Sequence, residues 1–331
     1  MASRSEVLQI IIDTLEVVLT QLQDDATPSR RADNFSKEEF WTCLSGTGKM
    51  VSQECTKLCV AFSQPPLPSV PETQSLVNSL ESSCIALLSA FHGLPKSQGL
   101  TLHKDLRLCV LNILKAVRDL CVEAKNESGQ QLPSVGNVWE KCNGLQNAPK
   151  DNKTSVLTVF KDQITMVQDA LDEFQESMEQ EDNLYPDLTD IPLRNGFQIP
   201  DQTGWREEDR QLLPAFLGLL KASKACIKKT KSIIATRGQC DREQDNNQLD
   251  SLASIVQTLS SHVDDFVLST YPPVVHSNVR QQATVLADGL KELINTANSS
   301  HLCEGDHSWT EFLLRAINHN YQKIIELLSQ N

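Results

Sequence analysis

The chain has 331 residues, of which 40% are hydrophobic, so it can bury one or two cores. Its formal net charge of −13 disfavours binding to nucleic acid or to an anionic membrane surface. The first residues lack the pattern of a signal peptide, and no uncharged apolar run is long enough to span a membrane. We therefore expect a soluble, folded, intracellular protein.

Apolar residues recur every three or four positions in nearly every long segment, which predicts an all-α fold with almost no strand. In the first half we expect helices over residues 4–24, 36–62, 70–92, 101–125 and 151–181, with a shorter element around 137–145. In the second half we expect helices over 206–236, 246–270, 274–298 and 308–329.

Residues 181–204 lose this periodicity and contain Pro186, Pro192 and Pro200, and residues 173–190 hold seven acidic residues and no Lys or Arg. Such a composition is typical of a linker. We therefore expect an N-terminal helical bundle over 1–180, an acidic linker over 181–204 and a C-terminal bundle over 205–331. By analogy, such up-and-down bundles resemble the vinculin and catenin type of architecture.

The most regular pattern is a heptad seam that advances by alternating steps of three and four residues. A seam of this kind fits two arrangements: a zipper-like surface for a partner helix or second copy, or a stripe packed inside the chain's own bundle. Its members, which we take as candidate partner-binding residues, are Leu157, Phe160, Ile164, Val167, Leu171, Phe174 and Met178.

A second candidate surface is basic. Within "LLKASKACIKKTKSII" four lysines follow one another at helical spacing, with apolar residues on the opposite face. The stripe could dock an acidic partner or the chain's own acidic linker, or it could be an ordinary solvated face. Its residues, also candidates for partner binding, are Lys221, Lys224, Lys228 and Lys231.

Motifs for chemistry are weak. "SGTGKM" at 45–50 is similar to a phosphate-binding loop, but Cys43 stands where the first glycine is needed and Met50 replaces the Ser or Thr. "HLCEGDH" supplies His301, Cys303 and His307, one ligand short of a closed zinc site. No hydrolase, metalloprotease or dinucleotide motif occurs in the sequence. We expect no enzyme activity, no cofactor and no metal, unless catalytic groups converge from separate helices.

The ten cysteines form no CxxC pair. Six of them lie on predicted apolar helix faces, which indicates small core residues in a reducing compartment rather than disulfides or metal ligands. They are Cys55, Cys59, Cys84, Cys109, Cys121 and Cys226.

The stretch "AFSQPPLPSVPETQSLV" at 61–77 is either a polyproline ligand for a WW or SH3 groove or a rigid turn between two helices. Ser69 and Glu72 can form a capping box, and Pro71 suits the first turn of a helix, which favours the turn. A related proline pair occurs in "LSTYPPVV".

Five strings carry a family resemblance: "FWTCLSGTGKMVSQECTKLCVAFSQPPLPS", "PKDNK", "KASKACIKK", "VDDFVLSTYPP" and "HSWTEFLLRAINHNYQKIIEL". In this order, from about residue 36 to the C-terminus, the chain resembles the cyclin-D-binding protein family, also called Grap- and cyclin-D-interacting protein.

The resemblance implies a helix-loop-helix and zipper-like protein without a basic DNA-binding region. It further implies negative regulation of the cell cycle and of transcription through D-type cyclin, in cytoplasm and nucleus. Further expected partners are helix-loop-helix transcription factors and SH2/SH3 adaptor proteins. We expect no direct binding to nucleic acid and no binding to a membrane. The alternative function is a cytoskeletal or scaffold bundle of the catenin or vinculin kind.

Overall fold

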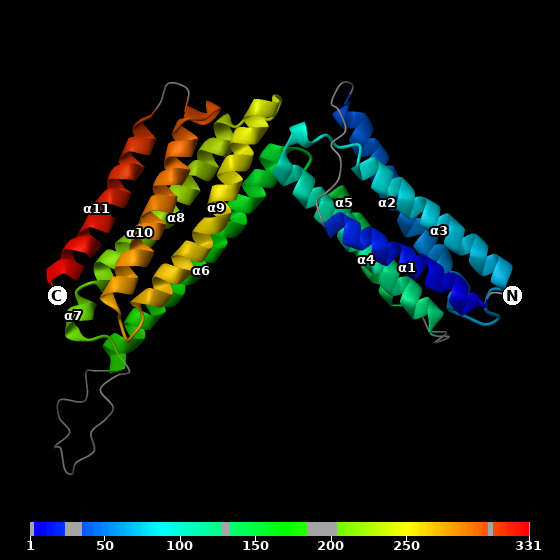
Figure 1. The fold of residues 1–331 in the computed structure, drawn as a ribbon, viewed down its shortest axis with the longest axis horizontal. Coiled ribbons are helices and arrows are strands. Elements are labelled where there is room, and N and C mark those ends of the chain that lie inside the picture. The colour runs from blue at the N-terminus through cyan, green and yellow to red at the C-terminus, as the bar shows by residue number, and fades with distance from the viewer. Residues whose placement is uncertain (1–2, 24–34, 127–132, 185–203, 304–306, 331) are drawn as a thin grey trace, which may run out of the picture. The chain divides into compact units, whose positions relative to one another are not determined.

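A computed structural model describes residues 3–23, 35–126, 133–184, 204–303 and 307–330, with only the backbone described for 181–184. Within these ranges every regular element is a helix, which confirms the all-α fold (Figure 1). None of these helices is long and apolar enough to cross a membrane. The chain divides into two compact units, residues 1–155 and residues 156–331.

Unit 1 contains α1 (Arg4–Gln23), α2 (Lys37–Phe62), α3 (Val70–Phe91), the 3-10 turn η1 (Lys96–Gln98), α4 (Leu100–Lys125) and α5 (Ser134–Gln146). Helix α2 packs against α3 and α5, α1 packs against α3 and α4, and α4 packs against α5. One apolar stripe of each helix faces a shared core, in which Leu44, Leu80 and Val117 are fully buried.

Unit 2 begins within α6 (Asn152–Leu184) and continues through α7 (Glu207–Arg210), α8 (Leu213–Arg237), α9 (Glu243–Thr270), α10 (His276–Asn298), the 3-10 turn η3 (His301–Cys303) and α11 (Ser308–Gln330). Helix α10 packs against α9 and α11, and α8 packs against α11. Helix α6 runs beside α9 and contributes Phe160 and Val167 to the same core (Figure 1).

The division into units differs from the expected bundles of 1–180 and 205–331. Helix α6 belongs to unit 2 because its apolar side chains pack there: the Phe174 ring lies 6.2 Å from that of Trp205 and 6.3 Å from that of Tyr271. The predicted linker therefore connects α6 to α7 within unit 2 rather than joining the two units. Its residues 181–184 continue α6, and its residues 185–203 lie outside the described residues.

The helix expected over 206–236 is divided into α7 and α8 at residues 211–212. Pro214 occupies the first turn of α8, where its missing N–H breaks no helical hydrogen bond. In a continuous helix the same proline would remove one hydrogen bond and clash with the preceding turn. The chain therefore ends one helix and begins another before Pro214.

The proline pairs occupy matching places: Pro65 and Pro66 connect α2 to α3, and Pro272 and Pro273 connect α9 to α10. The capping box of α3 is confirmed. The Ser69 backbone N–H donates to Glu72 Oε2 at 2.7 Å, and the Glu72 N–H donates to Ser69 Oγ at 3.4 Å.

Candidate functional site

The heptad seam of α6 lies in the core of unit 2. Phe160, Val167 and Phe174 are fully buried, and Leu171 is 4% exposed. The remaining members, Leu157, Ile164 and Met178, are partly buried and pack against the same core. The seam is therefore packed inside the chain's own bundle, and these side chains form no exposed zipper surface in this structure.

An aromatic cluster covers the end of the seam. The Trp205 and Tyr271 rings stack with centroids 6.0 Å apart beside Phe174, and Trp205 Nε1 donates to the Thr270 carbonyl at 2.6 Å. Because the indole N–H is paired, the ring can be buried without losing a hydrogen bond. This cluster holds α6 against the connection between α9 and α10.

The lysine stripe lies on the surface of α8. Lys221 and Lys228 are exposed, and Lys224 and Lys231 are half-buried, whereas Leu219, Ile227 and Ile234 on the other side of the helix are buried. Among the described residues, no carboxylate lies within 4.0 Å of any of these four amines. Of the two predicted sets of partner-binding residues, only this one has fully exposed members, Lys221 and Lys228.

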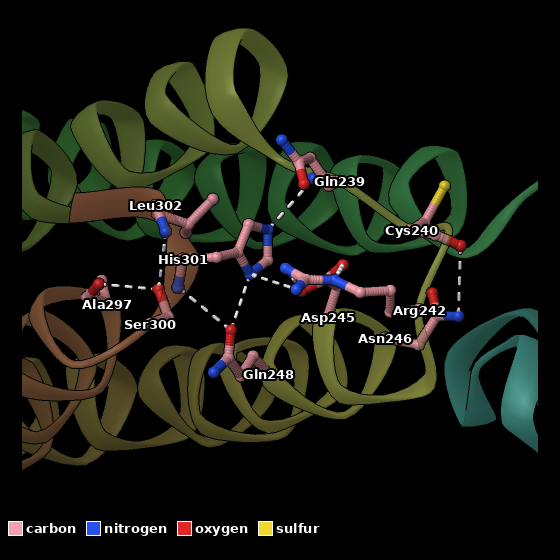
Figure 2. A network of polar contacts seen from close by, with 10 residues as sticks. All are labelled: Gln239, Cys240, Arg242, Asp245, Asn246, Gln248, Ala297, Ser300, His301 and Leu302. Carbon is pink, nitrogen blue, oxygen red and sulfur yellow. Dashed lines mark hydrogen bonds and ion pairs between the residues drawn. The ribbon is translucent and has the colours of Figure 1, made fainter. Parts of the chain in front are cut away.

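A polar cluster surrounds His301 in η3 (Figure 2). Its Nε2 accepts the backbone N–H of Gln239 at 3.0 Å, so its Nδ1 carries the proton and donates to Gln248 Oε1 at 2.6 Å. The backbone N–H of His301 also donates to Gln248 Oε1, at 3.0 Å. Both ring nitrogens are thus used in hydrogen bonds to the protein.

Asp245 is buried next to this histidine and forms a two-pronged ion pair with Arg242, with both N–O distances 2.9 Å. The hydrogen bonds from the Arg242 guanidinium hold the pKa of Asp245 below its usual range. His301 Nδ1 lies 3.8 Å from Asp245 Oδ1. The network joins the start of α9, the segment before it and η3, which is a structural role.

The two weak motifs also have structural roles. "SGTGKM" lies within α2, where a Cβ on Gly48 would lie 3.0 Å from Leu145 Cδ2 of α5, so this glycine allows a close helix contact. His307 Nδ1 lies 2.6 Å from Asn298 Oδ1. Within the described ranges, no cluster of three His, Cys, Asp or Glu side chains has the geometry to hold a metal ion.

The proline turn is packed against its own unit. Pro65 and Pro66 are exposed, but Pro68 is buried and its carbonyl accepts a hydrogen bond from Arg4 Nη1 of α1 at 3.3 Å. An open hollow of about 430 Å3 lies beside it, lined in part by Ala61 and Leu76. These contacts favour the rigid turn over a free polyproline ligand.

A hollow of about 650 Å3 lies between the first half of α2 and the second half of α3 in unit 1. Small residues leave this space, among them Ala86, Ser89 and Ala90 of α3 and Gly93 in the turn after it. Glu39 is the one carboxylate in its lining, which contains no His, Lys or Arg. Sequence reasoning missed this groove, although the spacing of small residues on one face of α3 was visible.

The cysteines are free thiols, and Cys55, Cys84, Cys121 and Cys226 are buried as expected. Burial raises the pKa of Cys84 and of Cys226 to about 12. Since the thiolate is the reactive form, these groups are inert at neutral pH.

Comparisons with known proteins give a consistent result. The model of the Grap2 and cyclin-D-interacting N-terminal region matches residues 44–180, and the model of the C-terminal region of the same family matches residues 167–295. The N-terminal match therefore includes most of α6, which packs in unit 2.

Relatives match along nearly the whole chain. The cyclin-D1-binding protein 1 homolog of Xenopus laevis is 37% identical over 327 residues, which cover 96% of this chain and 97% of the relative. The homolog of Danio rerio is 37% identical, covering 92% of this chain and 90% of the relative. Cyclin-D1-binding protein 1 of Homo sapiens is 31% identical, covering 99% of this chain and 94% of the relative. The chain belongs to the Grap2 and cyclin-D-interacting protein family.

Proposed function

We propose that this protein is a non-enzymatic adaptor that binds D-type cyclin and thereby restrains cell-cycle progression and associated transcription. The observation that carries the proposal is the full-length similarity to relatives named for binding cyclin D1. The similarity covers both units, so the proposed adaptor is the whole chain rather than one bundle of it.

Three features of the described residues support an adaptor over an enzyme. The ring nitrogens of His301 are both occupied by protein groups, burial keeps thiols such as Cys226 protonated, and the α2–α3 groove holds one carboxylate without a basic partner. General acid–base or nucleophilic catalysis needs ionisable groups that face a shared space, and these groups do not.

The binding step can be tested by light scattering of a mixture of the purified chain with purified D-type cyclin. We expect a species with the summed mass of both proteins, and none when a cyclin of another class is used. If the two proteins scatter only as separate species at concentrations on the order of tens of micromolar, the result counts against the proposal. A complex with a dissociation constant above this range would be sparsely occupied.

The regulatory step needs a separate assay. We expect increasing amounts of the chain to lower the rate at which a D-type cyclin-dependent kinase phosphorylates a retinoblastoma protein substrate. If the complex forms and this rate does not change, the chain binds cyclin without restraining it. The same proposal includes helix-loop-helix factors and SH2/SH3 adaptors as further partners, which two-hybrid pairing can test. It also includes residence in both cytoplasm and nucleus, which fluorescence microscopy can test.

A further inference from the structure

Helix α8 has a charge unlike that of the rest of the chain. Its 25 residues include five lysines and Arg237 and no Asp or Glu, in a protein whose net charge is −13. Two other basic residues of unit 2 have carboxylate partners: Arg242 pairs with Asp245, and Lys291 lies 3.2 Å from Asp288. None of the five lysines has such a partner among the described residues.

The lysines form a defined surface. Lys221, Lys224, Lys228 and Lys231 lie within about 80° of the helix circumference, since successive residues of a helix are about 100° apart. With a rise of about 1.5 Å per residue, the stripe is about 15 Å long. Cations near a helix C-terminus are favoured by the helix dipole, but that effect acts within the last turn and does not reach Lys221 or Lys224.

Among the described residues of unit 2, no carboxylate lies within 4.0 Å of an amine of this stripe. Where α6 runs beside α9, burial and the nearby Asp265 and Glu173 raise the pKa of Asp264. The carboxylates there repel one another, although the lysines of α8 belong to the same unit. None of these three carboxylates lies within 4.0 Å of a lysine amine of the stripe.

We propose that the lysine stripe of α8, formed by Lys221, Lys224, Lys228 and Lys231, is a docking surface for an acidic segment of a partner protein. Carboxylates that repeat at the same helical spacings can face the four amines along the whole stripe. This proposal does not depend on cyclin binding.

An acidic peptide fits this surface better than nucleic acid or a membrane. A duplex or a bilayer presents an anionic surface much longer than about 15 Å, and the net charge of −13 of this chain repels such a surface. A peptide of three helical turns meets the stripe alone.

The test is fluorescence anisotropy with the full chain and a labelled alanine-based peptide that carries Glu at the same three-, four- and three-residue spacings. We expect binding at about 50 mM salt that weakens at least about tenfold at about 300 mM, because exposed charge pairs are screened. A matched peptide with Gln in place of Glu is expected not to bind.

The variant Lys221→Glu/Lys228→Glu should weaken peptide binding at least about tenfold, since attraction becomes repulsion at two exposed positions. The control Lys161→Glu/Lys323→Glu changes the net charge equally at exposed positions of α6 and α11, and should change binding less than about twofold. Circular dichroism melting checks that each variant is folded. If Lys221→Glu/Lys228→Glu melts at a lower temperature than the parent chain, Lys221→Gln/Lys228→Gln replaces it, with an expected loss of peptide affinity of about threefold.

Three results would overturn the proposal. Equal losses in both variants would mean that the peptide responds to overall charge and not to the stripe. Equal binding of the Glu and Gln peptides would remove the carboxylates from the recognition. Tighter binding of duplex DNA or of phosphatidylserine vesicles than of the Glu peptide at the same salt would assign the surface to another class of partner.

Discussion

Replacing Leu171 of α6 by Glu tests whether the heptad seam is core. Leu171 is 4% exposed and belongs to the buried cluster of unit 2. Loss of the buried leucine costs about 1.5–3 kcal/mol. Keeping the new carboxyl neutral at pH 7 costs about 3.7 kcal/mol more, because the ordinary pKa of Glu is about 4.3 and each unit of pKa corresponds to about 1.36 kcal/mol.

The sum, about 5–7 kcal/mol, is comparable to the total stability of a domain, so we expect Leu171→Glu to unfold unit 2 at pH 7. Since the buried carboxyl has a raised pKa, its penalty falls as the pH drops toward about 4.3, and the variant should recover about 3 kcal/mol relative to the parent chain. Urea unfolding followed by circular dichroism at both pH values measures these differences.

The control is Met166→Glu, on the exposed face of the same helix. It should change the free energy of unfolding by no more than about 0.5 kcal/mol. If Leu171→Glu melts like Met166→Glu at pH 7 and loses only partner binding or self-association, the seam is a surface zipper and the packing described above is incorrect.

Three other changes test separate parts of the fold. Gly48→Leu should destabilise unit 1 by about 1–3 kcal/mol in urea unfolding, because the new side chain meets Leu145. The control Gly46→Leu has nothing within 4 Å of its Cβ and should stabilise α2 by up to about 1 kcal/mol in the same assay. Equal effects of the two variants would refute the close contact at Gly48. Ser69→Ala should cost about 1 kcal/mol in the same assay through loss of the α3 cap, and no change would mean that the cap is redundant. Asp245→Asn should reduce how much the free energy of unfolding falls in acid. The pKa of Asp245 is lowered in the folded chain, so its carboxylate adds stability above the ordinary Asp pKa. That stability is lost as the pH falls through the pKa of the folded chain, and an asparagine has no such contribution. Parallel acid limbs in parent and variant would contradict this assignment.

The local features of the fold could be predicted from the sequence because they depend on neighbouring residues. Helical periodicity predicted the helices, gathered the seam residues of α6 on one apolar face and placed the four lysines of α8 on one side, and the residue types at 69 and 72 predicted the capping box. Each of these features is determined within three or four residues along the chain.

The remaining features depend on contacts between distant segments. Periodicity showed that Phe174 faces a core but not that Trp205 and Tyr271 complete that core, so α6 was expected in the wrong unit. The His301 network takes groups from α9, from the segment before α9 and from η3, and no local pattern relates them. The α2–α3 groove likewise requires residues of two helices to meet.

The central claim, that this chain is a cyclin-D-binding adaptor, is tested most directly by isothermal titration of the full-length folded chain into purified D-type cyclin. We predict a saturable heat with one chain bound per cyclin and a dissociation constant below about 10 μM, equivalent to a binding free energy of about −7 kcal/mol or stronger. Absence of a saturable heat at several temperatures, with both proteins shown to be folded by circular dichroism, would contradict it.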